Sequence, residues 1–134
     1  MVTFGIFLIG GEDDEQGTLI LHEDRSGTCR LTFRWRDRET EAEAADYFEA
    51  FCGIRRVLET EGLIPFCYGA SLNVYPSAMA RDMGRGLKAY RITEGKHARR
   101  EDLVFIFGQG PDVIPAGVDM QRRFFDDWVA APRA

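Results

Sequence analysis

The chain has 134 residues, a net charge of −5, and 45% apolar against 29% charged residues. This composition excludes a disordered or collagen-like chain, and the length predicts a single domain over residues 1–134 that needs no disulfide or metal to fold. Since no apolar run approaches the roughly 20 residues of a membrane span, we expect no membrane attachment and a cytoplasmic location.

Alternation of apolar and polar residues predicts three strands in the first part of the chain. They cover residues 2–9, 18–24 and 28–36, and the third places its arginines on one face. Residues 10–17 and 25–27 have the composition of turns. One face of such an antiparallel meander meets the core and the other meets water, where arginines are expected to form cross-strand ion pairs.

A long helix is predicted over residues 40–62. Thr40 followed by Glu43 is typical of a capping box, and Gly62 followed by Pro65 is typical of a helix end. Apolar residues recur at the helical spacing that produces one buried stripe. This stripe consists of Ala44, Tyr47, Phe48, Phe51, Ile54 and Leu58.

The second half predicts more strands and two further helices. The expected strands are 64–75, 86–93 and 103–108, the expected short helix is 76–83, and the expected C-terminal helix is 118–130. The order of elements predicts an α+β fold, in which a mostly antiparallel sheet is covered by helices on one face.

Charge is distributed unevenly along the chain. Residues 1–63 carry fourteen acids against seven bases, and the rest of the chain carries eight acids against ten bases. An acidic half argues against nucleic-acid binding and suits a basic protein partner. The candidate contact acids are Glu12, Asp13, Asp14 and Glu15.

A basic cluster follows in the segment 73–91. Its candidate binding residues are Asn73, Ser77, Arg81, Arg85 and Lys88. Asn73 or Ser77 could cap the short helix, and the cations could bind a carboxylate or phosphate. A structural corner, a protein-contact surface and a small-anion site all fit these residues.

No catalytic constellation, cofactor motif or metal-ligand spacing is evident, so we expect a protein that is not an enzyme. Ser71 lies in "GASLN", which lacks the closing glycine of a nucleophile elbow. Cys29, Cys52 and Cys67 lie among apolar neighbours and are expected to be buried thiols in a reducing compartment.

One long segment resembles a known pattern. The run "CYGASLNVYPSAMARDMGRGLKAY" and the later "GPDVIPAGVDMQ" resemble a family of small bacterial proteins with a motif near G-x-S-x-N-V-Y-P-S-G-M-x-R-x-M-G-x-G-x-K-A-Y. The chain departs from the pattern at Ala78, where glycine is expected, and at Gly117, where threonine is expected. The family is similar in size, acidity and cytoplasmic character to immunity proteins that neutralise bacterial toxins, and the resemblance implies no catalytic residue.

Three hypotheses follow. The first is a cytoplasmic binding protein of the immunity type, which would meet a basic toxin through its acidic surface. The second is a small-anion-binding protein or enzyme centred on residues 73–91, and it requires the basic side chains to converge and to lack internal partners. The third is a homo-oligomeric structural protein that associates through an edge strand or the exposed sheet face.

Overall fold

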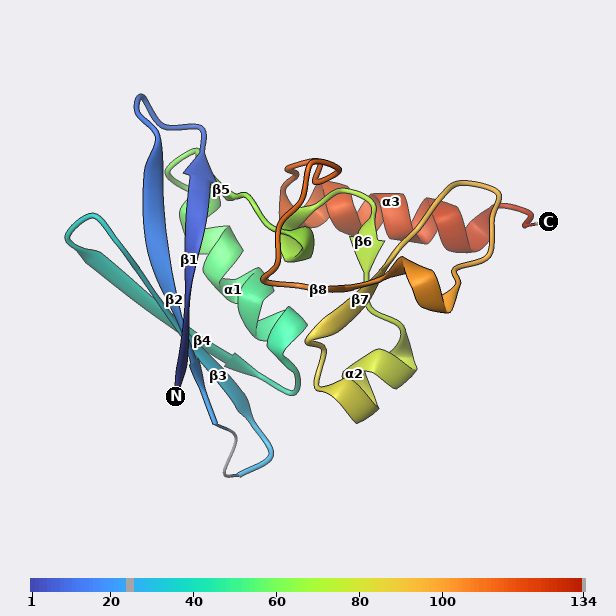
Figure 1. Cartoon of the computed structure of the whole chain (residues 1–134), viewed down its shortest axis with the longest axis horizontal. Coiled ribbons are helices and arrows are strands. Elements are labelled where there is room, and N and C mark those ends of the chain that lie inside the picture. The colour runs from blue at the N-terminus through green and yellow to red at the C-terminus, as the bar shows by residue number, and fades with distance from the viewer. Residues whose placement is uncertain (24–25, 134) are drawn as a thin grey trace.

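The computed structural model describes residues 1–23 and 26–133, and it confirms the α+β class (Figure 1). A five-stranded antiparallel sheet has the strand order β4-β3-β2-β1-β5, and a three-stranded sheet has the order β6-β7-β8. The strands are β1 (Val2–Ile9), β2 (Glu15–His22), β3 (Cys29–Trp35), β4 (Arg38–Ala44), β5 (Ile64–Pro65), β6 (Val74–Tyr75), β7 (Lys88–Arg91) and β8 (Leu103–Phe105). The helices are α1 (Tyr47–Glu59), α2 (Ala78–Gly84) and α3 (Val118–Ala130), with 3-10 turns at Tyr68–Ala70 and Arg100–Asp102.

The first three strands lie where alternation predicts them. β2 begins at Glu15 rather than at residue 18, because Gly17 belongs to the strand and not to the turn. A Cβ at Gly17 would lie 2.2 Å from the ring of Phe33, so this position in the sheet has room only for glycine. The predicted end of the second strand at residue 24 and the start of the next turn at residue 25 lie outside the described residues.

The predicted start of the long helix is wrong, because residues 40–44 belong to strand β4. The stretch 39–44 reads Glu-Thr-Glu-Ala-Glu-Ala, which has the period of a strand. Its glutamates pair with the arginine row of β3, through Arg30 to Glu41 at 2.8 Å and Arg34 to Glu39 at 2.6 Å. The expected cross-strand ion pairs are therefore present, with β4 as their partner strand.

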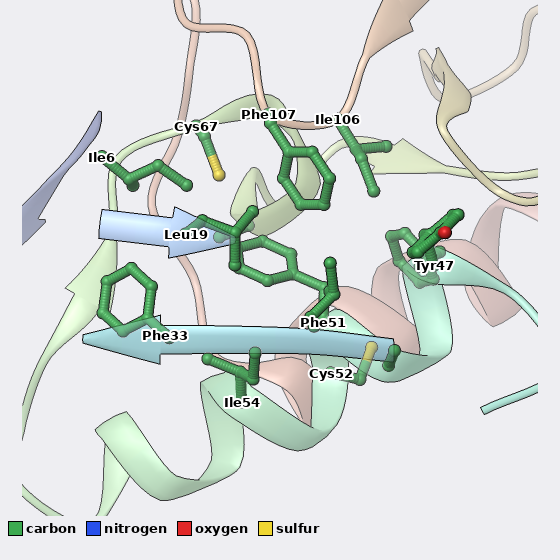
Figure 2. Close-up of a cluster of buried hydrophobic side chains, with 14 of the residues drawn as sticks. Ile6, Leu19, Phe33, Tyr47, Phe51, Cys52, Ile54, Cys67, Ile106 and Phe107 are labelled. Atoms are coloured by element: carbon green, nitrogen blue, oxygen red, sulfur yellow. The ribbon is translucent and has the colours of Figure 1, made fainter. Parts of the chain in front are cut away.

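Helix α1 instead begins after Asp46, whose side chain accepts a hydrogen bond from the Glu49 N–H at 2.8 Å. The apolar stripe of α1 packs between the five-stranded sheet and the segment after β8 (Figure 2). Phe51 lies near the centre of this core, with its ring edge-to-face with Phe107 at 5.2 Å between centroids. Because Phe33 from the sheet is buried in the same cluster, one core joins both halves of the chain.

The segment 64–75, predicted as one strand, consists of two short strands separated by a 3-10 turn. Gly69 lies against the Ile106 backbone and donates its N–H to the Ile106 carbonyl at 2.7 Å. This close approach bends the chain, so β5 pairs with β1 and β6 pairs with β7 in the other sheet.

The two later helices agree closely with the sequence prediction. Ser77 is the N-cap of α2, so Pro76 precedes the cap instead of opening the helix as predicted. At α3 the N-cap Gly117 has no side chain to offer, and the Glu59 carboxylate of α1 accepts the Val118 N–H at 3.4 Å. No helix of the described residues is long and apolar enough to cross a membrane.

Candidate functional site

The acidic tip is the loop between β1 and β2 and consists of Glu12, Asp13 and Asp14, all exposed. Within residues 1–23 and 26–133, no hydrogen bond or ion pair reaches these three carboxylates. Their charge is therefore available to a partner. Glu15, the fourth predicted contact acid, differs from them because it is already engaged.

Glu15 makes a bidentate ion pair with Arg36, with distances of 3.0 Å to Nε and 2.7 Å to Nη2. The Arg36 hydrogen bonds lower the pKa of Glu15 below its ordinary value. Arg36 also lies 3.7 Å from Glu61, which Arg38 contacts at 2.6 Å. Glu15 thus belongs to an ion-pair network that joins the sheet to the residues just after α1.

An apolar groove lies beside the acidic tip. It has a volume of about 570 Å³, and Asp14 and Glu15 form its acidic side. Phe7 and Ile9, which lie on the open face of β1, are 47% and 43% exposed. The remaining lining comes from Leu8, Phe66 and the segment Gln109–Pro111. An apolar floor with an acidic rim is the arrangement expected of a surface that contacts a basic protein.

The basic corner at 73–91 is arranged differently, because its central cation has internal partners. Arg81 Nη1 donates to Asp46 Oδ2 at 3.0 Å and to Glu49 Oε1 at 3.1 Å. Its guanidinium also lies over the rings of Phe48 and Tyr75, 5.3 Å and 5.6 Å from their centroids. Arg81 therefore links α2 to the start of α1. Its guanidinium, which a small-anion site at this corner would use as a ligand, is already held by internal partners.

The other predicted residues of the corner also have structural contacts. Ser77 Oγ accepts the Ala80 N–H at 3.0 Å, and Asn73 Oδ1 accepts the Ser71 hydroxyl at 2.9 Å. Arg85 has a left-handed backbone with φ of 55°, and its carbonyl accepts the Tyr47 N–H at 2.7 Å. Lys88 is exposed at the start of β7. Of these contacts, the Arg85 carbonyl links the corner to α1, whereas those of Ser77 and Asn73 are local.

The aromatic stack is a further feature of this half. Tyr75 and Phe125 stack with ring centroids 4.1 Å apart, and Phe125 lies 6.1 Å from Trp128. Arg81 covers Tyr75 at one end, and the Arg133 guanidinium lies 4.5 Å from the Trp128 ring at the other. The stack joins α2, β6 and α3, and a hollow of about 410 Å³ lies beside it. The ring and cation contacts described above are internal to the fold, and we assign the stack a structural role.

Sequence reasoning missed the buried pair Arg55 and Gln121, each 1% exposed. Arg55 Nη1 donates to Gln121 Oε1 at 2.7 Å and to the Gly69 carbonyl at 3.0 Å, and Nη2 donates to the Ala116 carbonyl at 3.1 Å. Gln121 Nε2 in turn donates to the carbonyls of Gly69, Ser71 and Val74. Burial lowers the pKa of Arg55, because removal of the guanidinium from water disfavours its charged form.

A signal for Arg55 exists in the sequence. Arg55 lies four residues after Phe51 and three before Leu58, which places it on the buried stripe of α1. An arginine in that register predicts a buried hydrogen-bond network, but its acceptors could not be named. They come from segments up to 66 residues away in the chain.

The nucleophile candidates weighed from the sequence, Ser71 and the three cysteines, are buried. All three cysteines are buried as predicted, and burial raises the pKa of the Cys67 thiol to about 12. Ser71 is fully buried and its Oγ accepts the Ile114 N–H at 2.9 Å. In the described ranges, no group of three or more His, Cys, Asp and Glu side chains is placed to hold a metal ion.

Comparison with known proteins adds no assignment. No protein-family model matches the chain, and a search of curated proteins finds no significant match.

Proposed function

We propose that this chain is a binding protein that takes a basic protein partner at the acidic tip and the apolar groove. The observation that carries the proposal is the position of the groove, whose apolar floor at Phe7 and Ile9 lies beside Asp14 of the acidic tip. Apolar anchors supply affinity at such surfaces, and the charged rim speeds and orients encounter. The resemblance to immunity-type proteins suggests a toxin as the partner and inhibition as the outcome.

Binding without catalysis is part of the same proposal. It is supported by the enclosure of Ser71 and the three cysteines, which leaves their reactive atoms without access to a substrate. Buried thiols also suit a reducing compartment, so we place the protein in the cytoplasm. The small-anion alternative is not carried further, since Arg81 is held by Asp46 and Glu49.

The test is capture of a partner from a lysate of the source organism, followed by mass spectrometry and reconstitution of the purified pair. The wild-type chain is compared with Asp13→Lys/Asp14→Lys, which reverses the tip, and with Phe7→Ser, which removes the groove's aromatic anchor. A matched control is Asp126→Lys/Asp127→Lys, which applies the same charge change to exposed positions of α3.

The proposal predicts a stoichiometric basic partner that the wild type and the control retain and that both site variants lose. Since the site residues are exposed, the free energy of unfolding of each variant should lie within about 0.5 kcal/mol of the wild-type value. A partner that binds both site variants as tightly as it binds the wild type would contradict the proposal.

A further inference from the structure

The two edges of the five-stranded sheet differ in how they are protected. The edge strand β4 carries a charged residue at four of its seven positions: Arg38, Glu39, Glu41 and Glu43. Charged side chains are the usual protection of an edge against pairing with another chain. At the opposite side β1 reads VTFGIFLI and carries no charge.

Strand β5 covers only the last part of the β1 edge. It pairs Leu8 with Pro65 and Ile9 with Ile64, and no other described strand continues this side of the sheet (Figure 1). The stretch from Val2 to Ile6 is therefore an open edge. Thr3 and Gly5 within it are exposed.

The direction of the free backbone groups follows from one hydrogen bond. The Phe66 N–H donates to the Phe7 carbonyl at 2.7 Å, so the backbone groups of Phe7 point away from β2. In an antiparallel strand, alternate residues direct both N–H and C=O to the same side. The N–H and C=O groups of Thr3 and Gly5 therefore also point outward, and the described residues supply no strand to receive them.

We propose that the open edge of β1 pairs with β1 of a second copy of this chain, which would join two five-stranded sheets into one. If the two strands run antiparallel with Phe4 opposite Phe4, Thr3 of each copy lies opposite Gly5 of the other copy. The same register places Val2 opposite Ile6 of the second copy and ends there, because Phe66 already occupies the outward side of Phe7. Val2 is 51% exposed, so each end of the new ladder covers an apolar side chain.

A second copy fits this edge better than a charged partner because β1 has no charge with which to recognise one. It also fits β1 better than β4, since two antiparallel β4 edges would set rows of glutamates against each other. A two-fold antiparallel pairing closes on itself and stops at a dimer. This inference does not depend on the acidic tip, which is a separate part of the surface.

The test is sedimentation velocity of the full chain over a range of concentrations. We expect a concentration-dependent dimer of the 15.2 kDa chain. Thr3→Glu places like charges at diagonal neighbour positions on the same face of the new ladder and should raise the dimer dissociation constant at least about tenfold. The matched control Thr18→Glu makes the same change on the same face of β2, an interior strand, and should leave dimerisation unchanged.

Amide hydrogen exchange keeps the test decisive if a variant folds poorly. In the wild type, the Thr3 and Gly5 amides should exchange fast in dilute samples and slowly in concentrated ones, whereas the Phe4 amide, which faces β2, should stay protected in both. A wild type that sediments as a monomer at every concentration would overturn the proposal. So would a dimer whose Thr3 and Gly5 amides exchange equally fast at both concentrations.

Discussion

The acidic tip and the basic corner are both charge clusters on short connections, yet the fold uses them in opposite ways. At the corner, Arg81 contacts two carboxylates and two aromatic rings, and Ser77 caps a helix. At the tip, Glu12, Asp13 and Asp14 have no partner among the described residues. A cluster of charge is therefore a candidate site only when distant parts of the chain leave it unpaired.

The largest effect is expected from Arg55→Met, which removes the buried cation of the network with Gln121. The change leaves the buried carbonyls of Gly69 and Ala116 with fewer donors, and it should lower the free energy of unfolding by about 3 kcal/mol. Urea denaturation measures this loss. Arg56→Met is the matched control, since Arg56 is exposed and pairs with exposed Asp119, and it should cost less than about 1 kcal/mol. Equal losses in the two variants would remove the structural role assigned to Arg55.

A smaller loss is expected from Arg81→Met, which sharpens the comparison at the basic corner itself. The variant leaves the buried Asp46 carboxylate without its cation and should destabilise the fold by about 1–2 kcal/mol. Arg122→Met serves as a control, because its ion pair with Asp126 is exposed and should contribute at most about 0.5 kcal/mol. An Arg81→Met variant as stable as the wild type would contradict the structural role of Arg81. The Arg81 guanidinium would then again be a candidate ligand-binding group.

The smallest effect concerns pH and His22, a partly buried residue of the open sheet face. Burial, followed by the charge of Arg30, lowers the pKa of His22 below the ordinary value of about 6.5. The unfolded chain then binds this proton more tightly than the folded chain does. The stabilisation is therefore present above the unfolded pKa and is lost as pH falls through the folded one.

His22→Gln should reduce the difference in unfolding free energy between pH 7.5 and pH 5.5. The carboxylates with lowered pKa values, Glu15, Glu41 and Asp112, titrate below this window and provide no competing change there. An unchanged difference in the variant would show that another group governs stability in this range.

Local patterns predicted much of the fold. Alternation located β1 and β3, helical spacing located α3, and capping chemistry gave Ser77 as one of two candidate caps of α2, beside Asn73. These signals lie within a few residues of one another, so they can be recognised without knowledge of the tertiary structure.

The sequence predictions were wrong or incomplete where contacts between residues far apart in the chain determine the structure. Thr40 and Glu43 fit a capping box, yet residues 39–44 also alternate, and the arginine row of β3 selects the strand. Arg81 was predicted as a candidate ligand because its partner Asp46 lies 35 residues away. At the acidic tip the sequence identified the charges, but not the groove, which requires Phe66 and the segment Gln109–Pro111 to fold beside Phe7.

The most direct test of the central claim is the affinity of the reconstituted partner for Asp13→Lys/Asp14→Lys, measured by calorimetry at low and at physiological salt. We expect binding at least about 100-fold weaker than that of the wild type, with the larger difference at low salt because salt screens the charge attraction. Stability should be unchanged. An affinity equal to that of the wild type at both salt concentrations would contradict the claim that the acidic tip is a binding surface.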